Sequence, residues 1–206
     1  GYAEIHLLRA QQAIESGRSG TADLEEAITR ADEVLAFDPR TARAHILKAR
    51  AAVLSGDYED AQRILNEARV IDGLGDSVSL ITEQAEILLQ QGTRLINDAA
   101  TRDEAIGVLQ QAEYTASEAL YLNPYEDRAH AIRTRAALAE GRAGQAVLYT
   151  ETWRIAAPSS PSAFRLLGDA RIAEGNTELA LDAYTRAVDL GADPASLVAA
   201  LQARAD

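Results

Sequence analysis

The stretch ARAHILKARAAVLSGDYEDAQRILNEARVIDG, residues 42–73, carries the pattern that decides the fold. Two runs rich in alanine and leucine flank a short polar break, Ser55-Gly56-Asp57. Glycine readily adopts the left-handed conformation that ends a helix, and an aspartate beside it can cap the next helix. In the second run, Ala61, Leu65 and Ala68 recur at steps of four and three, which places them on one helical stripe. The stretch therefore predicts two helices joined by a tight turn, with small side chains at the helix contact.

The same pattern recurs along the chain with a period of 34 residues. Pro39 and Gly73, which follow the ends of predicted helices, lie 34 residues apart, as do Pro124 and Pro158. The interval from Gly73 to Pro124 is 51 residues, which is 34 plus 17. Upstream of each helix end lies a stripe of mostly small residues with the same spacing: Ala27, Ala31 and Val34; Ala61, Leu65 and Ala68; Ala112, Ala116 and Ala119; Ala146, Thr150 and Trp153; Ala180, Tyr184 and Ala187. Such periodicity predicts stacked helix pairs.

A longer duplication relates the first two copies to the next two. Arg43-Ala44-His45 recurs as Arg128-Ala129-His130, 85 residues later. The fifth copy has no such counterpart, and residues 194–205 follow it as a short amphipathic segment. We expect this segment to be a helix that covers the last repeat with a polar outer face, because terminal repeats need one.

This arrangement resembles the tetratricopeptide repeat family, most clearly over residues 42–73 and 161–192 and with gaps over nearly the whole chain. The position that the family fills with tryptophan holds other residues here: His45, Ser79, His130 and Phe164. The resemblance implies an all-α, right-handed α-solenoid of antiparallel helix pairs with about 11 helices. We expect a single solenoid over residues 1–206, with repeats at 3–39, 42–73, 76–124, 127–158 and 161–192 and a capping helix at 194–205. The 17 extra residues of the third repeat should lengthen both of its helices, to 76–98 and 101–122.

Composition and charge exclude several classes of function. The formal net charge is −12, and an acidic chain repels the phosphates of nucleic acids and anionic lipid head groups. The chain has no cysteine, so disulfides and thiolate metal sites are excluded. No apolar run reaches the roughly 18 residues of a membrane span. No phosphate loop and no G-x-S-x-G motif occur. We therefore predict no enzyme activity, no cofactor or metal, no nucleic acid partner and no direct membrane insertion.

The beginning of the chain and its basic residues bear on its origin. The sequence starts with Gly1, has no methionine, and has Lys48 as its only lysine among many arginines. We expect a segment cut from a longer protein, so that a signal, an anchor or a neighbouring domain could lie outside it. The arginine bias is typical of a GC-rich, bacterial genome. The sequence does not decide between cytoplasm and periplasm.

The resemblance also implies a binding surface, because the first helices of such repeats line a concave groove that holds an extended peptide or a partner helix. The side chains expected there are Arg43, Ile46, Arg50, Val53, Leu80, Gln84, Arg128, Arg135, Leu138, Arg165 and Asp169. Guanidinium groups bind carboxylates through paired hydrogen bonds, which favours an acidic peptide or a free carboxyl terminus as the ligand. The alternative is that these arginines pair with Glu or Asp on neighbouring helices.

One subgroup of the family captures carboxyl termini with Lys and Asn at fixed first-helix positions. Here those positions hold Ile46 with Arg50, and Ala131 with Arg135. We therefore do not expect a heat-shock-type chaperone ligand.

The histidines and the tryptophan favour packing over chemistry. His6, His45 and His130 have no accompanying His-x3-His or carboxylate cluster, so we expect them to pack rather than to bind a metal. Trp153 stands where the repeat usually has alanine, and we expect it to fill a gap in the core. The alternative for Trp153 is an exposed hot spot for a partner.

Three tyrosines, Tyr114, Tyr121 and Tyr125, cluster around the long second helix expected in the third repeat. We expect them to fill the core, with a surface for self-association as the alternative. The chain as a whole is predicted to be a protein–protein interaction scaffold that binds a peptide or helix. Two other functions stay open: an envelope, secretion or pilus assembly factor that acts through self-association, and a regulatory domain of a larger enzyme.

Overall fold

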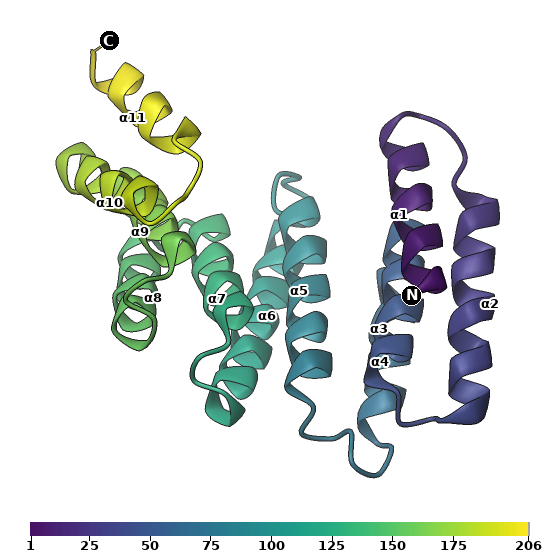
Figure 1. Cartoon of the computed structure of the whole chain (residues 1–206). Helices are drawn as coiled ribbons and strands as arrows, with labels where there is room; N and C mark the ends of the chain where they lie inside the picture. Colours follow the sequence, from purple (N-terminus) through teal and green to yellow (C-terminus); the bar gives the residue numbers. More distant parts are fainter. Residues whose placement is uncertain (206) are drawn as a thin grey trace. The chain divides into compact units, whose positions relative to one another are not determined.

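The computed structural model describes residues 1–205, in which α-helix is the only regular secondary structure (Figure 1). Eleven helices follow one another in this part of the chain: α1 (Tyr2–Glu15), α2 (Thr21–Phe37), α3 (Ala42–Leu54), α4 (Tyr58–Arg69), α5 (Val78–Leu95), α6 (Arg102–Leu122), α7 (Asp127–Ala139), α8 (Ala143–Ala156), α9 (Pro161–Ala173), α10 (Thr177–Asp189) and α11 (Ala195–Ala205). None of the helices in the described residues has the length and hydropathy to span a bilayer. The predicted all-α class is confirmed.

The tight turns between paired helices have the chemistry that the sequence predicted. Between α3 and α4, Gly56 has a φ of 85°, a conformation that costs side-chain-bearing residues energy. Asp57 then caps α4, because its carboxylate accepts a hydrogen bond from the backbone N–H of Asp60 at 2.8 Å. Gly175 and Asn176 repeat this arrangement between α9 and α10, with a φ of 79° at the glycine. Each turn therefore ends one helix and begins the next within three residues.

The contacts between residues divide the chain into two compact units. Unit 1 comprises Gly1–Ile87, and unit 2 begins at Leu88 and contains the rest of the chain. The boundary falls within α5, so that one part of this helix belongs to each unit. In each unit, helices contact those next to them or next but one along the chain. This is the contact pattern of a repeat array.

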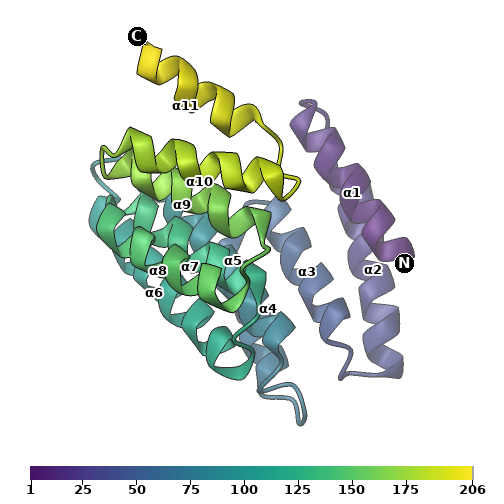
Figure 2. The ribbon, with the colours of Figure 1, turned by 60° about the vertical axis from the view of Figure 1, so that its left-hand side comes forward.

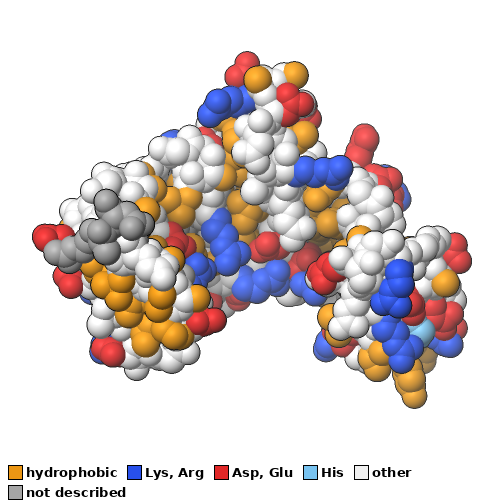
Figure 3. Space-filling model, turned by 90° about the horizontal axis from the view of Figure 1, so that it is seen from above, with side chains coloured by type: hydrophobic (Ala, Val, Ile, Leu, Met, Phe, Trp, Pro, Cys, Tyr) orange, Lys and Arg blue, Asp and Glu red, His pale blue; other side chains and the backbone are white. Residues whose placement is uncertain are grey.

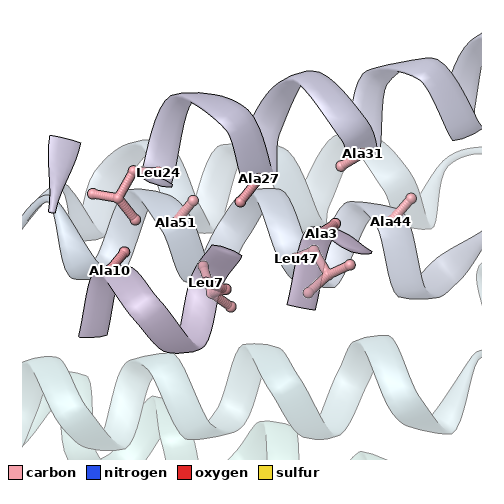
Figure 4. Packing of buried hydrophobic residues seen from close by; sticks show 9 residues of the cluster. All are labelled: Ala3, Leu7, Ala10, Leu24, Ala27, Ala31, Ala44, Leu47 and Ala51. Atoms are coloured by element: carbon pink, nitrogen blue, oxygen red, sulfur yellow. The ribbon is translucent and has the colours of Figure 1, made fainter. Parts of the chain in front are cut away.

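The core of unit 1 is built from small residues that allow the helix backbones to approach closely. Figure 4 shows its first cluster, with three residues from each of α1, α2 and α3: Ala3, Leu7 and Ala10; Leu24, Ala27 and Ala31; Ala44, Leu47 and Ala51. A second cluster lies between α3, α4 and the start of α5, around Leu65 and Leu80. Alanines and leucines thus form almost all of these two clusters, and the predicted stripes contribute Ala27, Ala31, Ala61, Leu65 and Ala68.

In unit 2, α7, α8, α9 and α10 lie side by side (Figure 2). The fully buried indole of Trp153 packs against Ala163 and Leu166 of α9. Where α9 crosses α10, Gly168 leaves room for the ring of Tyr184. A methyl group on Gly168 would lie only 2.3 Å from a carbon of that ring. A residue without a side chain is therefore required at this crossing.

The two helices of the third pair are the longest in the described chain. α5 contains 18 residues and α6 contains 21, compared with 13 in α3 and 12 in α4.

The last helix, α11, packs on α10 through Leu197 and Ala200. Its Val198 and Leu201 are half-exposed, so the outer face of α11 is less polar than expected. Figure 3 shows hydrophobic side chains gathered on the surface at the left of the view.

Candidate partner-binding surfaces

The expected groove residues of α3 share one helical face, but two of them are engaged in the core. Arg43, Ile46, Arg50 and Val53 recur at steps of three and four, as a single face requires. Arg43 and Arg50 are exposed, whereas Ile46 and Val53 are half-buried and pack against the second cluster of unit 1. The apolar members of this face therefore support the fold, and only the arginines extend outward.

Arg50 is held by a buried carboxylate of the neighbouring helix. Its Nε and Nη2 donate hydrogen bonds to the two oxygens of Glu83 on α5, both at 2.6 Å. Such a bidentate pair fixes the guanidinium in one orientation. The hydrogen bonds to Glu83 raise the pKa of Arg50 above its ordinary value. Arg43 is likewise paired, with Glu4 of α1. The guanidinium groups of both arginines thus donate their hydrogen bonds to partners within unit 1.

Two predicted groove residues of α5 are buried, so the prediction that they face a partner is wrong. Leu80 lies in the second core cluster of unit 1 and is fully buried. Gln84 donates a hydrogen bond to Asn66 at 2.7 Å and accepts one from Arg69 at 2.9 Å. An amide with both partners inside unit 1 joins α4 to α5 and is not available to a ligand.

The groove residues of unit 2 differ in how far their polar groups are already satisfied. Arg165 donates to Asp169 at 2.9 Å, and Asp169 also accepts from the hydroxyl of Tyr184 at 2.7 Å. Arg128 and Arg135 of α7 are exposed. Leu138, one turn beyond Arg135, is half-buried and packs against two core clusters of unit 2. Among the described residues, Arg135 has no ion-pair or hydrogen-bond partner. Arg135 is therefore the predicted groove arginine with its hydrogen-bond donors open to a ligand.

The aromatic network around Trp153 confirms packing for this tryptophan and excludes an exposed hot spot. The rings of His130 and Trp153 stack with centroids 5.6 Å apart and planes 5° from parallel. Nε2 of His130 donates to the carbonyl oxygen of Pro124 at 2.9 Å, and the indole N–H donates to Asp127 at 2.8 Å. Burial lowers the pKa of His130 below its ordinary value. In the described part of the chain, no three His, Cys, Asp or Glu residues lie close enough to hold a metal.

Two other sequence expectations are wrong. Tyr114, Tyr121 and Tyr125 were expected to fill the core, but they are 71%, 87% and 71% exposed. Their aromatic rings lie on the solvent side of α6 and of the turn after it.

Val34, the third residue of the first small-residue stripe, was expected to pack like its counterparts. It is 44% exposed, whereas Ala68, Ala119, Trp153 and Ala187 at the equivalent positions are at most 2% exposed.

These helix pairs, with glycine turns and small-residue stripes at a 34-residue period, define the class as an α-helical repeat protein. Residues 13–73 match the family model of the tetratricopeptide repeat. The solved structures that are similar to the whole chain include tetratricopeptide repeat proteins as well. The chain therefore carries tetratricopeptide repeats over residues 13–73, and its described part has the fold of tetratricopeptide repeat proteins.

Three of these structures show how far the similarity extends. TTC0263, a thermophilic repeat protein from Thermus thermophilus, is 18% identical, with a TM-score of 0.68 over 99% of this chain and 100% of the other. MamA from Desulfovibrio magneticus RS-1, residues 41 to the end, is 13% identical, with a TM-score of 0.61 over 92% and 94%. YrrB, a repeat protein with an unusual peptide-binding site, is 19% identical, with a TM-score of 0.58 over 98% and 91%. No curated protein sequence matches the chain. At these identities the similarity shows the fold.

Proposed function

We propose that this protein is a scaffold that binds an extended peptide or a helix of a partner protein along the surface of its first helices. The tetratricopeptide repeat is a protein-interaction fold, and its members are generally scaffolds without enzymatic activity. YrrB, which has a similar fold, has a peptide-binding site. Repeat arrays offer such surfaces because helix pairs present side chains at a regular spacing.

The observation that carries this proposal is the state of Arg135. Its guanidinium is exposed and has no polar partner in the described residues, and the half-buried Leu138 lies one helical turn away. A carboxylate can accept two hydrogen bonds from such a group, while the part of Leu138 that the core leaves exposed contacts an apolar side chain next to it. The ligand best suited to this pair is a peptide with an acidic residue beside an apolar one.

The test compares two variants with the same charge change. Partners captured from a lysate by the wild-type protein are identified, and the affinity of the purified partner is then measured for Arg135→Glu and Arg102→Glu. Arg102 is an exposed arginine at the start of α6, outside the expected groove. We expect at least tenfold weaker binding for Arg135→Glu and no change for Arg102→Glu. Equal affinity of both variants would exclude Arg135 as a contact.

Arg50 is unsuitable for this test. Arg50→Glu would place a second carboxylate against the buried Glu83, so that a loss of binding would reflect a damaged core. Circular dichroism of each variant before the binding measurement confirms that the fold is retained.

A second candidate function, assembly through self-association, is favoured by the exposure of the tyrosines of α6. Tyr114 and Tyr121 lie two turns apart on one face of this helix, and Tyr125 follows it. Aromatic rings on a surface are typical of protein interfaces. Light scattering over a range of concentrations tests this function. A dimer that is lost in Tyr121→Glu but retained in Phe37→Glu, an equally drastic change at an exposed residue of unit 1, would support it. A monomer at all concentrations would exclude it.

A further inference from the structure

Unit 1 contains a cavity of about 510 Å³ where α1, α2 and α3 meet. Its mostly apolar wall includes Ala31 and Val34 of α2 together with Ala44 and Leu47 of α3. Figure 4 shows Ala31, Ala44 and Leu47 toward the same end of the first core cluster. The charged groups around the cavity are all paired, Glu4 with Arg43 and with the amino group of Gly1, and Arg30 with Glu26 and Glu33. The cavity therefore offers a ligand apolar contacts rather than a net charge.

The repeat pattern assigns each wall residue a counterpart in unit 2. Ala31, Val34, Ala44 and Leu47 each have a counterpart 119 residues later: Thr150, Trp153, Ala163 and Leu166, respectively. In unit 2, Trp153, Ala163 and Leu166 form one buried cluster. The wall of the cavity thus corresponds to the surroundings of an indole ring, with valine in the position of the tryptophan.

The two copies differ in whether this space is filled. Trp153 is fully buried because its ring fills the space between α7, α8 and α9. In unit 1 the corresponding space stays open and Val34 is 44% exposed, although the smaller Ala68, Ala119 and Ala187 are buried at the equivalent positions of other repeats. An empty apolar space of this size lacks the dispersion contacts that a filled one provides, so a ring that enters it gains them.

We propose that this cavity binds a planar aromatic side chain, a phenyl or an indole ring, from a partner protein. The inference rests on the proposed function in one respect, that a partner protein supplies the aromatic side chain. The site itself follows from the equivalence with Trp153. If Gly17 is aligned with Gly141, both of which have positive φ, then Ala3 stands where Asp127 accepts the indole N–H. Ala3 lines the cavity and cannot accept a hydrogen bond through its side chain, so shape rather than the N–H selects the ring.

The test uses 5-fluoroindole and fluorine NMR with the full chain. We expect saturable line broadening with a Kd of about 1 mM, as befits a ligand of this size. Val34→Trp should fill the cavity with its own ring and weaken binding at least tenfold. Val70→Trp makes the same change at an exposed residue of unit 1, directly after α4 and outside the cavity, and should bind like the wild type. Circular dichroism and the urea midpoint establish that both variants are folded.

Three results would overturn the proposal. The first is the absence of saturable broadening with the wild type. The second is undiminished broadening with folded Val34→Trp. The third is that 4,4-difluorocyclohexanol, a saturated ring, binds as tightly as 5-fluoroindole. The cavity would then be an apolar space without preference for a planar group. None of these results depends on Arg135, so a failure here is distinguishable from a failure of the proposed function.

Discussion

Gly168 and Gly107 both lie inside helices, but their surroundings differ. A methyl group at Gly168 would lie 2.3 to 2.7 Å from three ring carbons of the buried Tyr184, whereas one at Gly107 would meet nothing within 4 Å. We expect Gly168→Ala to lower the free energy of unfolding by about 1–3 kcal/mol because the ring must move. Gly107→Ala should raise it by about 0.5–1 kcal/mol, since alanine favours the helix. Urea unfolding measures both, and equal effects would contradict the assigned crossing.

His130 makes the stability depend on pH. Burial lowers the pKa of His130 in the folded protein, while the unfolded chain takes up the proton near the ordinary value of 6.5. As the pH falls below 6.5, the unfolded state therefore binds a proton that the folded state does not, and stability decreases. Above that value this contribution is constant. We expect wild type to lose more stability between about pH 7.5 and about pH 5.5 than His130→Gln does. Parallel pH profiles of the two proteins would refute this role.

Among the helices, the start of α4 provides a test of capping. The Asp57 side chain accepts the backbone N–H of Asp60, whereas Thr41 at the start of α3 makes no such hydrogen bond. We expect Asp57→Ala to cost about 1 kcal/mol, because it leaves a helix donor without its partner. Thr41→Ala should cost at most a few tenths of this. Thermal unfolding, followed by circular dichroism, measures the loss of stability in both variants. A larger loss for Thr41→Ala than for Asp57→Ala would contradict the observed cap.

The helices themselves show why the sequence predicted where most of them lie but not which face of α5 is exposed. Turns such as Gly56-Asp57 and stripes such as Ala61, Leu65 and Ala68 are local signals, and local signals determine where helices begin and which face packs. The third repeat has 17 extra residues, so the register of the other repeats does not hold there. Leu80 and Gln84 were assigned to the surface from that register. The side chain that meets Arg50 is Glu83, 33 residues away in sequence, and no local pattern marks that pairing.

The whole molecule should respond to damage locally, because each helix contacts those nearest to it in the chain. In such arrays, stability is close to a sum over repeats and their interfaces. Amide hydrogen exchange of Gly168→Ala should therefore accelerate in α9 and α10 and stay at wild-type rates in α1 and α2. Acceleration of the same size in all helices would show that the chain unfolds as one cooperative unit instead.

At this scale the sequence predicted the all-α repeat fold but not the surfaces. The 34-residue period is a property of the chain alone, so it could be recognised without coordinates. The exposure of Tyr121 and the open space beside Val34 depend on what the neighbouring helices cover, and a repeat pattern assigns the same environment to every copy. The candidate sites therefore arise where one copy departs from the others.

Val34 and Trp153 also show what duplication makes available in evolution. Two descendants of one ancestral repeat experience different selection: one can keep its interior closed while the other drifts. A copy whose helices leave this space open then holds a vacancy with a ready-made shape. The complement of that shape is already encoded elsewhere in the same gene. New specificity in such a protein can thus begin in the one copy whose interior stays unfilled.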